Sequence, residues 1–241
     1  YQDFGAIEQI ARALEEGFVF QGEHFRFWNA PRGSKPAGIP LYRHVICTQN
    51  HDQVGNRAQG DRLTHLIPLG ARKLTAALLL LAPHTPMLWM GQEYDEAAPF
   101  QFFTDFGDPA LRKAVSEGRR REFEQFSWTE VPDPQDPETF QRSKLRWTTS
   151  ERSHRDMLEW YRSLLRLRRE FIMESERTCR AEIHSKNKIL TMQVPAQNSR
   201  LLLLAELPAG ASAAEQPLPD DGWQQTLSSS EDGFRVQVYR R

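Results

Sequence analysis

Cysteine is scarce in this sequence of 241 residues, and its two cysteines, Cys47 and Cys179, lie far apart along the chain. Two isolated cysteines indicate neither a disulfide framework nor a cysteine-rich metal site. The histidines also lack the spacing that metal ligands show on a helix, which argues against a His-Asp metal pair like that of phosphohydrolases. We therefore expect a protein of the reducing cytoplasm with no metal site.

An excess of one charge is also absent, because 31 Lys and Arg residues accompany 32 Asp and Glu residues, for a net charge of −1. A balanced charge gives no overall attraction to nucleic acid or anionic membranes, so an uncharged substrate suits the chain better. The longest apolar run, around 78–82, is far short of the roughly 20 residues that cross a bilayer. We expect a soluble protein with neither a nucleic-acid nor a membrane partner.

The first half of the chain alternates helix and strand patterns. The chain opens at Tyr1 on a segment typical of a helix start, without a signal-peptide pattern, and we interpret it as part of a longer protein. Helical spacing of apolar residues predicts helices over 3–17 and 69–82. Short apolar runs predict buried strands over 43–48 and 87–91. This order predicts the α/β class with a parallel sheet.

The second half begins with a stretch of fading periodicity, 92–147, which is rich in aromatic residues and proline and is typical of an insertion. Ser153 and Asp156 form a capping-box pattern that opens a helix to about Arg169. After Glu174, short alternating or apolar runs predict strands of a small antiparallel β domain. These strands are expected at 189–194, 201–204 and 234–239. We therefore predict two domains, 1–174 and 175–241, the second resembling a β-sandwich.

The most informative segment is the string Gln49-Asn50-His51-Asp52-Gln53-Val54-Gly55-Asn56-Arg57, directly after the first predicted strand. Its Asn-His-Asp core resembles the fourth short motif of the alpha-amylase clan of glycoside hydrolases. The whole string resembles the malto-oligosyltrehalose trehalohydrolases within that clan. Five further passages show the same likeness, which spans about residues 1–170; they are 16–22, 90–94, 98–100, 118–123 and 132–134.

The resemblance implies the C-terminal part of a (β/α)8 barrel, with active groups at the carboxyl ends of its strands. Residues 43–48 and 86–90 would be strands seven and eight, and 92–147 a long insertion. It also implies a retaining hydrolase that cleaves the α-1,4 bond next to the trehalose end of maltooligosyl trehalose, or acts on a related α-glucan. Such chemistry needs no cofactor and no metal.

Site roles follow from the same resemblance. Asp52 would stabilise the oxocarbenium-like transition state, and His51 would donate a hydrogen bond to hydroxyls of the same glucose. The loop Gln53, Val54, Gly55 and Asn56 would line the substrate site. The nucleophile and general acid of this clan follow strands four and five, so they would lie outside this chain. We expect the chain to be inactive alone.

Other readings remain open. The chain could come from another alpha-amylase-clan enzyme, a branching or debranching one, or be a non-catalytic sugar-binding fragment. Glu93 and Asp95 are carboxylates near the second predicted strand, but no local pattern makes either a nucleophile or an acid. Trp128 and Trp147 are weak candidates for stacking on glucose. The charge run Arg119, Arg120 and Arg121 is typical of a solvated helix face.

Overall fold

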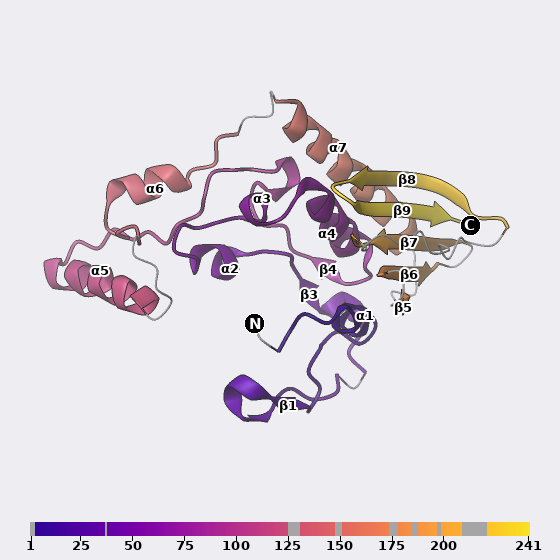
Figure 1. Cartoon of the computed structure of the whole chain (residues 1–241), viewed down its shortest axis with the longest axis horizontal. Helices are drawn as coiled ribbons and strands as arrows, with labels where there is room; N and C mark the ends of the chain where they lie inside the picture. The colour runs from indigo at the N-terminus through magenta and orange to yellow at the C-terminus, as the bar shows by residue number, and fades with distance from the viewer. Residues whose placement is uncertain are drawn as a thin grey trace. The chain divides into compact units, whose positions relative to one another are not determined.

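The computed structural model describes residues 3–36, 38–124, 131–147, 151–173, 178–184, 188–196, 199–208 and 221–241 (Figure 1). It divides into two compact units. The first unit comprises 1–46, 69–87 and 160–241, and the second comprises 47–68 and 88–159. The C-terminal strands belong to the first unit because they pack on helices from the first half of the chain. The domains 1–174 and 175–241 stay a prediction.

The first unit contains the expected helix–strand–helix–strand order. Its elements are α1 (Ile7–Glu16), β3 (Val45–Ile46), α4 (Leu69–Leu81) and β4 (Thr85–Pro86). The two strands pair in parallel, with Val45 opposite Thr85, and the amide of Met87 donates to the carbonyl oxygen of Ile46 at 2.8 Å. The predicted parallel arrangement of these strands is thus confirmed.

Both strands are much shorter than 43–48 and 87–91. Residues 41–43 form a 3-10 helix, η2 (Leu41–Arg43), and β3 pairs only with β4 among the described residues, which leaves Val45 65% exposed rather than buried. At the second strand, the amide of Trp89 donates to the side chain of Gln92 at 2.7 Å instead of to a strand. The backbone then turns into η3 (Gln92–Tyr94). A two-residue ladder therefore replaces each expected strand.

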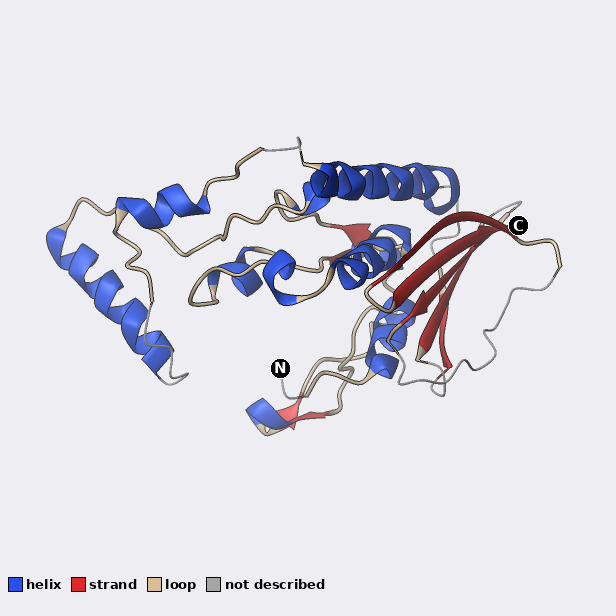
Figure 2. Cartoon of the chain, turned by 45° about the horizontal axis from the view of Figure 1, so that its top comes forward, coloured by secondary structure: helices blue, strands red, loops and turns tan. Residues whose placement is uncertain are grey.

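A five-stranded antiparallel sheet forms the C-terminal end of the chain, as expected (Figure 2). Its strands lie in the order β5-β6-β7-β9-β8. They are β5 (Arg180–His184), β6 (Ile189–Pro195), β7 (Arg200–Glu206), β8 (Gln224–Glu231) and β9 (Phe234–Arg240). The leucines of 201–204 are all buried, as expected of a core strand. The described strands of 175–241 form a single sheet, with no second sheet of a sandwich among them.

Helix α4 joins the sheet to the parallel strands. It is buried on most sides, and its Lys73 forms an ion pair with Glu231 at the end of β8. The indole of Trp160 donates to the carbonyl oxygen of Lys73 at 3.0 Å. The amide of Gly70 donates to Asp232 at 3.1 Å, in the turn between β8 and β9. The first turn of α4 therefore rests directly on this turn.

A further helix ends in an unusual geometry. Helix α7 runs over Arg152–Leu167 and continues as a π-helical turn, η4, over Arg168–Ile172. The helix begins before Ser153, so this residue lies inside it rather than at the predicted cap. The guanidinium of Arg168 donates to three carbonyl oxygens at and after the end of α4, at 2.6–2.8 Å. This cation satisfies carbonyl groups that a helix end leaves unpaired.

The second unit contains several helices. They are α2 (His51–Gly55), α3 (Leu63–Leu66), η3, α5 (Pro109–Glu124) and α6 (Pro137–Ser143). The two longest lie inside 92–147, so the expectation of irregular structure there is wrong in part. Helix α5 buries only Arg119 and Phe123, which leaves no apolar stripe to predict it. Among the described residues, no helix is both long and apolar enough to span a bilayer.

Candidate active site

The predicted site segment folds as a capped helix, α2. Asn50 is its N-cap, and the side-chain oxygen of Asn50 accepts the amides of Asp52 at 2.8 Å and Gln53 at 3.3 Å. In return, the side-chain oxygen of Gln53 accepts the amide of Asn50 at 2.9 Å. This reciprocal capping box satisfies amides that a helix start leaves unpaired. The pattern Asn50-x-x-Gln53 is visible in the sequence and could have predicted the helix.

His51 and Asp52 occupy the first turn of α2. The Nε2 atom of His51 lies 3.3 Å from Oδ1 of Asp52, and each side chain is 68% exposed. The ring of His51 lies 6.1 Å from that of Trp89, which meets Phe100 edge to face at 5.0 Å. The imidazole of His51 thus lies beside the Trp89 ring, while the Asp52 carboxylate is exposed to solvent.

The remaining predicted site residues divide by exposure. Val54 is buried, at 2% exposure, and contributes packing beneath the helix. Gly55 is buried as well, and its carbonyl oxygen is held by another side chain. The side chain of Gln53 serves the cap, and Asn56 is exposed at the helix end, where its amide donates to the carbonyl oxygen of Asp52 at 3.2 Å. The structure therefore exposes His51, Asp52, Gln53 and Asn56 to solvent and buries Val54 and Gly55.

Arg119 on α5 holds the end of α2. Its guanidinium donates to the carbonyl oxygen of Gly55, to Oδ1 of Asn56 at 3.5 Å and to Glu122 at 2.9 Å. The side chain is only 7% exposed, so the expectation of a solvated face is wrong for this residue. It is right for Arg120 and Arg121, which are exposed. The sequence of a charge run does not show which of its arginines is buried.

The segment that carries Trp89 is braced by two buried charges. Arg62 is 1% exposed and donates to the carbonyl oxygens of Met90 at 2.8 Å and Ala98 at 2.6 Å. Glu96, also 1% exposed, accepts the amide of Ala98 at 2.7 Å and the guanidinium of Arg146 at 3.1 Å. Burial by itself raises the pKa of the Glu96 carboxyl, but these hydrogen bonds outweigh it and hold the pKa below its usual value.

Neither of the other carboxylates nearby stands in a catalytic arrangement. Asp95 is buried, with a left-handed backbone (φ 62°), and accepts the hydroxyl of Thr64 at 3.3 Å. Glu93 is half-buried on η3. Burial and the neighbouring Glu96 raise the pKa of Tyr94 to about 12, which keeps this phenol protonated. These groups brace the segment rather than offer a nucleophile.

The structure describes only one of the two tryptophans that were weak candidates for stacking on glucose. Trp147 is 72% exposed and its ring stacks on Tyr94 with centroids 6.2 Å apart, so one face remains open. Trp128 lies outside the described residues. Among the described residues, no group of three His, Cys, Asp or Glu side chains is placed to hold a metal ion.

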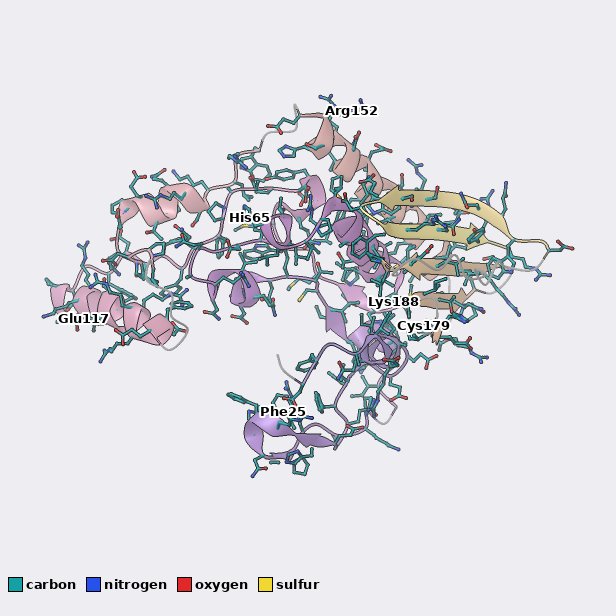
Figure 3. The ribbon with its side chains drawn as sticks, viewed as in Figure 1. Phe25, His65, Glu117, Arg152, Cys179 and Lys188 are labelled. Carbon is teal, nitrogen blue, oxygen red and sulfur yellow. The ribbon has the colours of Figure 1, made fainter. Side chains whose placement is uncertain are left out.

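The first unit has an aromatic cavity of about 570 Å³ that the sequence did not indicate. It lies beside the hairpin of β1 (His24–Phe25), η1 (Arg26–Trp28) and β2 (Ala30–Pro31), where Figure 3 labels Phe25. The Arg32 guanidinium lies over four rings at 4.3–5.8 Å. These rings are Phe4, Phe20, Phe25 and Trp28. Flat apolar faces beside a hydrogen-bond donor suit a sugar ring.

The sequence has several close relatives. The malto-oligosyltrehalose trehalohydrolase of Rhizobium sp. (strain M-11) is 48% identical over 175 residues, which cover 70% of this chain and 29% of the relative. That of Saccharolobus solfataricus is 39% identical over 182 residues, covering 76% and 31%. By sequence, the chain is a relative of the malto-oligosyltrehalose trehalohydrolases. It spans about 30% of the length of these relatives. No protein-family model matches the chain.

A solved structure agrees with this relationship. A crystal structure described as an alpha amylase from Salmonella typhimurium matches with a TM-score of 0.82 and 37% identity. The match covers 96% of this chain and 41% of the solved one. The likeness to trehalohydrolases and to the alpha-amylase family is thus confirmed, and the antiparallel sheet fits a C-terminal domain.

Proposed function

We propose that the chain is the C-terminal part of a retaining trehalohydrolase that acts on maltooligosyl trehalose. The enzyme would cleave the α-1,4 bond next to the terminal trehalose unit and release trehalose. The observation that carries this proposal is α2, whose capping box holds His51 and Asp52 exposed, in a chain 39% to 48% identical to trehalohydrolases. Both cysteines are free, in keeping with the cytoplasm.

In this proposal β3 and β4 are strands seven and eight of a (β/α)8 barrel. Two features support the assignment: the strands are parallel, and α4 connects them, as in a βαβ unit. The site segment follows β3 in the chain after Cys47 and Thr48, on the carboxyl side of the strand, where barrel enzymes place their active groups. The short ladders leave the remaining strands to be supplied by the rest of the protein.

Asp52 would act on the positive charge that develops at the anomeric carbon, and His51 would donate to hydroxyls of the same sugar. A preorganised carboxylate is effective when water is excluded, since solvent screens its field. Asp52 is 68% exposed in this chain. The rest of the protein would therefore supply the residues that exclude water from the site. It would also supply the nucleophile and the general acid.

The proposal is tested on the full-length protein that carries this chain. With maltooligosyl trehalose as substrate, Asp52→Asn should lower the rate of trehalose release by about 100-fold or more, because one preorganised charge is lost. Asp105→Asn is the matched control, since it removes an equal charge from an exposed position of the same unit. A fully active Asp52→Asn variant would show that the site assignment is wrong.

The rival functions give different products. A branching enzyme of the same clan would cut an α-1,4 link and transfer the released chain to form an α-1,6 link. A debranching enzyme would cleave α-1,6 links in glycogen, and neither would release trehalose. A non-catalytic sugar-binding protein would bind maltoheptaose and leave it unchanged. Chromatography of the products from maltooligosyl trehalose, glycogen and maltoheptaose separates the three cases.

A further inference from the structure

The Arg119 side chain is held by aromatic rings and hydrogen-bond acceptors of the second unit. Its guanidinium carbon lies 4.4 Å from the ring centre of Phe123 and 5.0 Å from that of Phe102. Its nitrogens donate to Gly55 and Asn56 at the end of α2. A guanidinium is planar and has five donors, so it can stack on rings and bind two acceptors at once.

This contact joins segments that lie far apart in sequence. Gly55 is 64 residues from Arg119, and α2 has only five residues. A helix so short is not stable by itself and needs tertiary contacts. The carbonyl end of a helix also carries partial negative charge, which a cation stabilises. The guanidinium is thus placed where it fixes both the position and the end of α2.

We propose that Arg119 is a positioning residue for the active site, acting through Gly55 and Asn56 on the helix that carries His51 and Asp52. The inference rests on the proposed function. It gives a role to α5, a helix that lies in the segment expected to be an insertion. Arg119 touches no reacting atom in this scheme. It fixes the position of α2, from which Asp52 and Asn56 would contact the sugar.

The test compares Arg119→Gln and Arg119→Lys with Arg121→Gln in the full-length protein. Arg121 is the matched control, since it is exposed on the same helix. Misplacing a catalytic group by about 1 Å can cost about 100-fold, so we expect kcat for trehalose release to fall by about 10- to 100-fold in Arg119→Gln. Lysine offers one point charge instead of a fork and should restore only part of the rate.

A second measurement separates positioning from general destabilisation. The effects of Arg119→Gln and Asn56→Ala on kcat/KM should be less than additive, because both changes release the same end of α2. Additive effects, or a kcat of Arg119→Gln within about twofold of wild type at a temperature where both are folded, would show that Arg119 only stabilises α5.

Hydrogen exchange tests the inference without a measurement of activity. The amides of 54–57 should exchange faster in Arg119→Gln than in Arg121→Gln, with the amides of the β sheet unchanged. If the wild-type protein releases no trehalose, the proposed function fails and this comparison still decides the role of Arg119. Equal exchange in the two variants would overturn the inference.

Discussion

Two histidines meet inside the first unit, where the rings of His44 and His84 lie 6.0 Å apart. His84 is 1% exposed, and burial, together with the neighbouring imidazole, lowers its pKa to about 4. Because imidazole in an unfolded chain has a pKa of about 6.5, the unfolded state binds a proton that the folded state excludes between these values. The neutral form of His84 is therefore part of the folded structure.

This residue predicts a dependence of stability on pH. Above about pH 6.5 both states are neutral at this position and the folded state has its full stability. As the pH falls from about 6.5 to about 4, we expect the free energy of unfolding to decrease by about 3 kcal/mol. Urea unfolding of the full-length protein at several pH values measures it. In His84→Gln the decrease should shrink, whereas exposed His24→Gln should leave it unchanged.

At the scale of elements, the contact between α4 and the β8–β9 turn leaves no room for a side chain at Gly70. A Cβ atom there would lie 2.0 Å from the carbonyl oxygen of Glu231. The helix and the turn must separate to accept it, and the amide of Gly70 would then lose Asp232. This position requires glycine for close approach and not for backbone freedom.

Replacing this glycine should destabilise the first unit. We expect Gly70→Ala to lower the free energy of unfolding by about 1–3 kcal/mol, as overpacking does. Gly118→Ala is the matched control, because a Cβ on this helical glycine of α5 meets no atom within 4 Å. It should raise stability by up to about 1 kcal/mol through helix propensity. Thermal unfolding of both variants tests the pair, and equal shifts would contradict the close packing.

The elements that sequence predicted are those with continuous runs of buried apolar side chains. The leucines of 201–204 and most of the apolar residues of 69–82 are buried as expected, because apolar side chains fill the interior of the first unit. Helix α5 was missed because its buried side chains are one arginine and one phenylalanine. In the candidate site, the roles of His51 and Asp52 stay a prediction from the string, whereas the contact of Arg119 with Gly55 and Asn56 arises from tertiary structure and no local pattern indicated it.

At the scale of the whole molecule, the chain offers one of the groups that the proposed reaction needs. We therefore expect the 241-residue chain, produced alone, to release no trehalose at concentrations where the full-length protein is readily measured. Chromatography of products after long incubation checks this expectation. Trehalose release by the isolated chain that disappears in Asp52→Asn would show that the chain contains its own nucleophile and acid.

The turn between β8 and β9 has a consequence for how the protein is made. Gly70 meets Asp232 across 162 residues of chain. A ribosome adds about 5–20 residues per second, so the first turn of α4 emerges about 10 to 30 s before its partner has been translated. During that interval an apolar helix lacks the surface that covers it, and chaperones have time to bind it. Messages truncated before the codon for Asp232 would leave the first turn of that helix permanently without this partner.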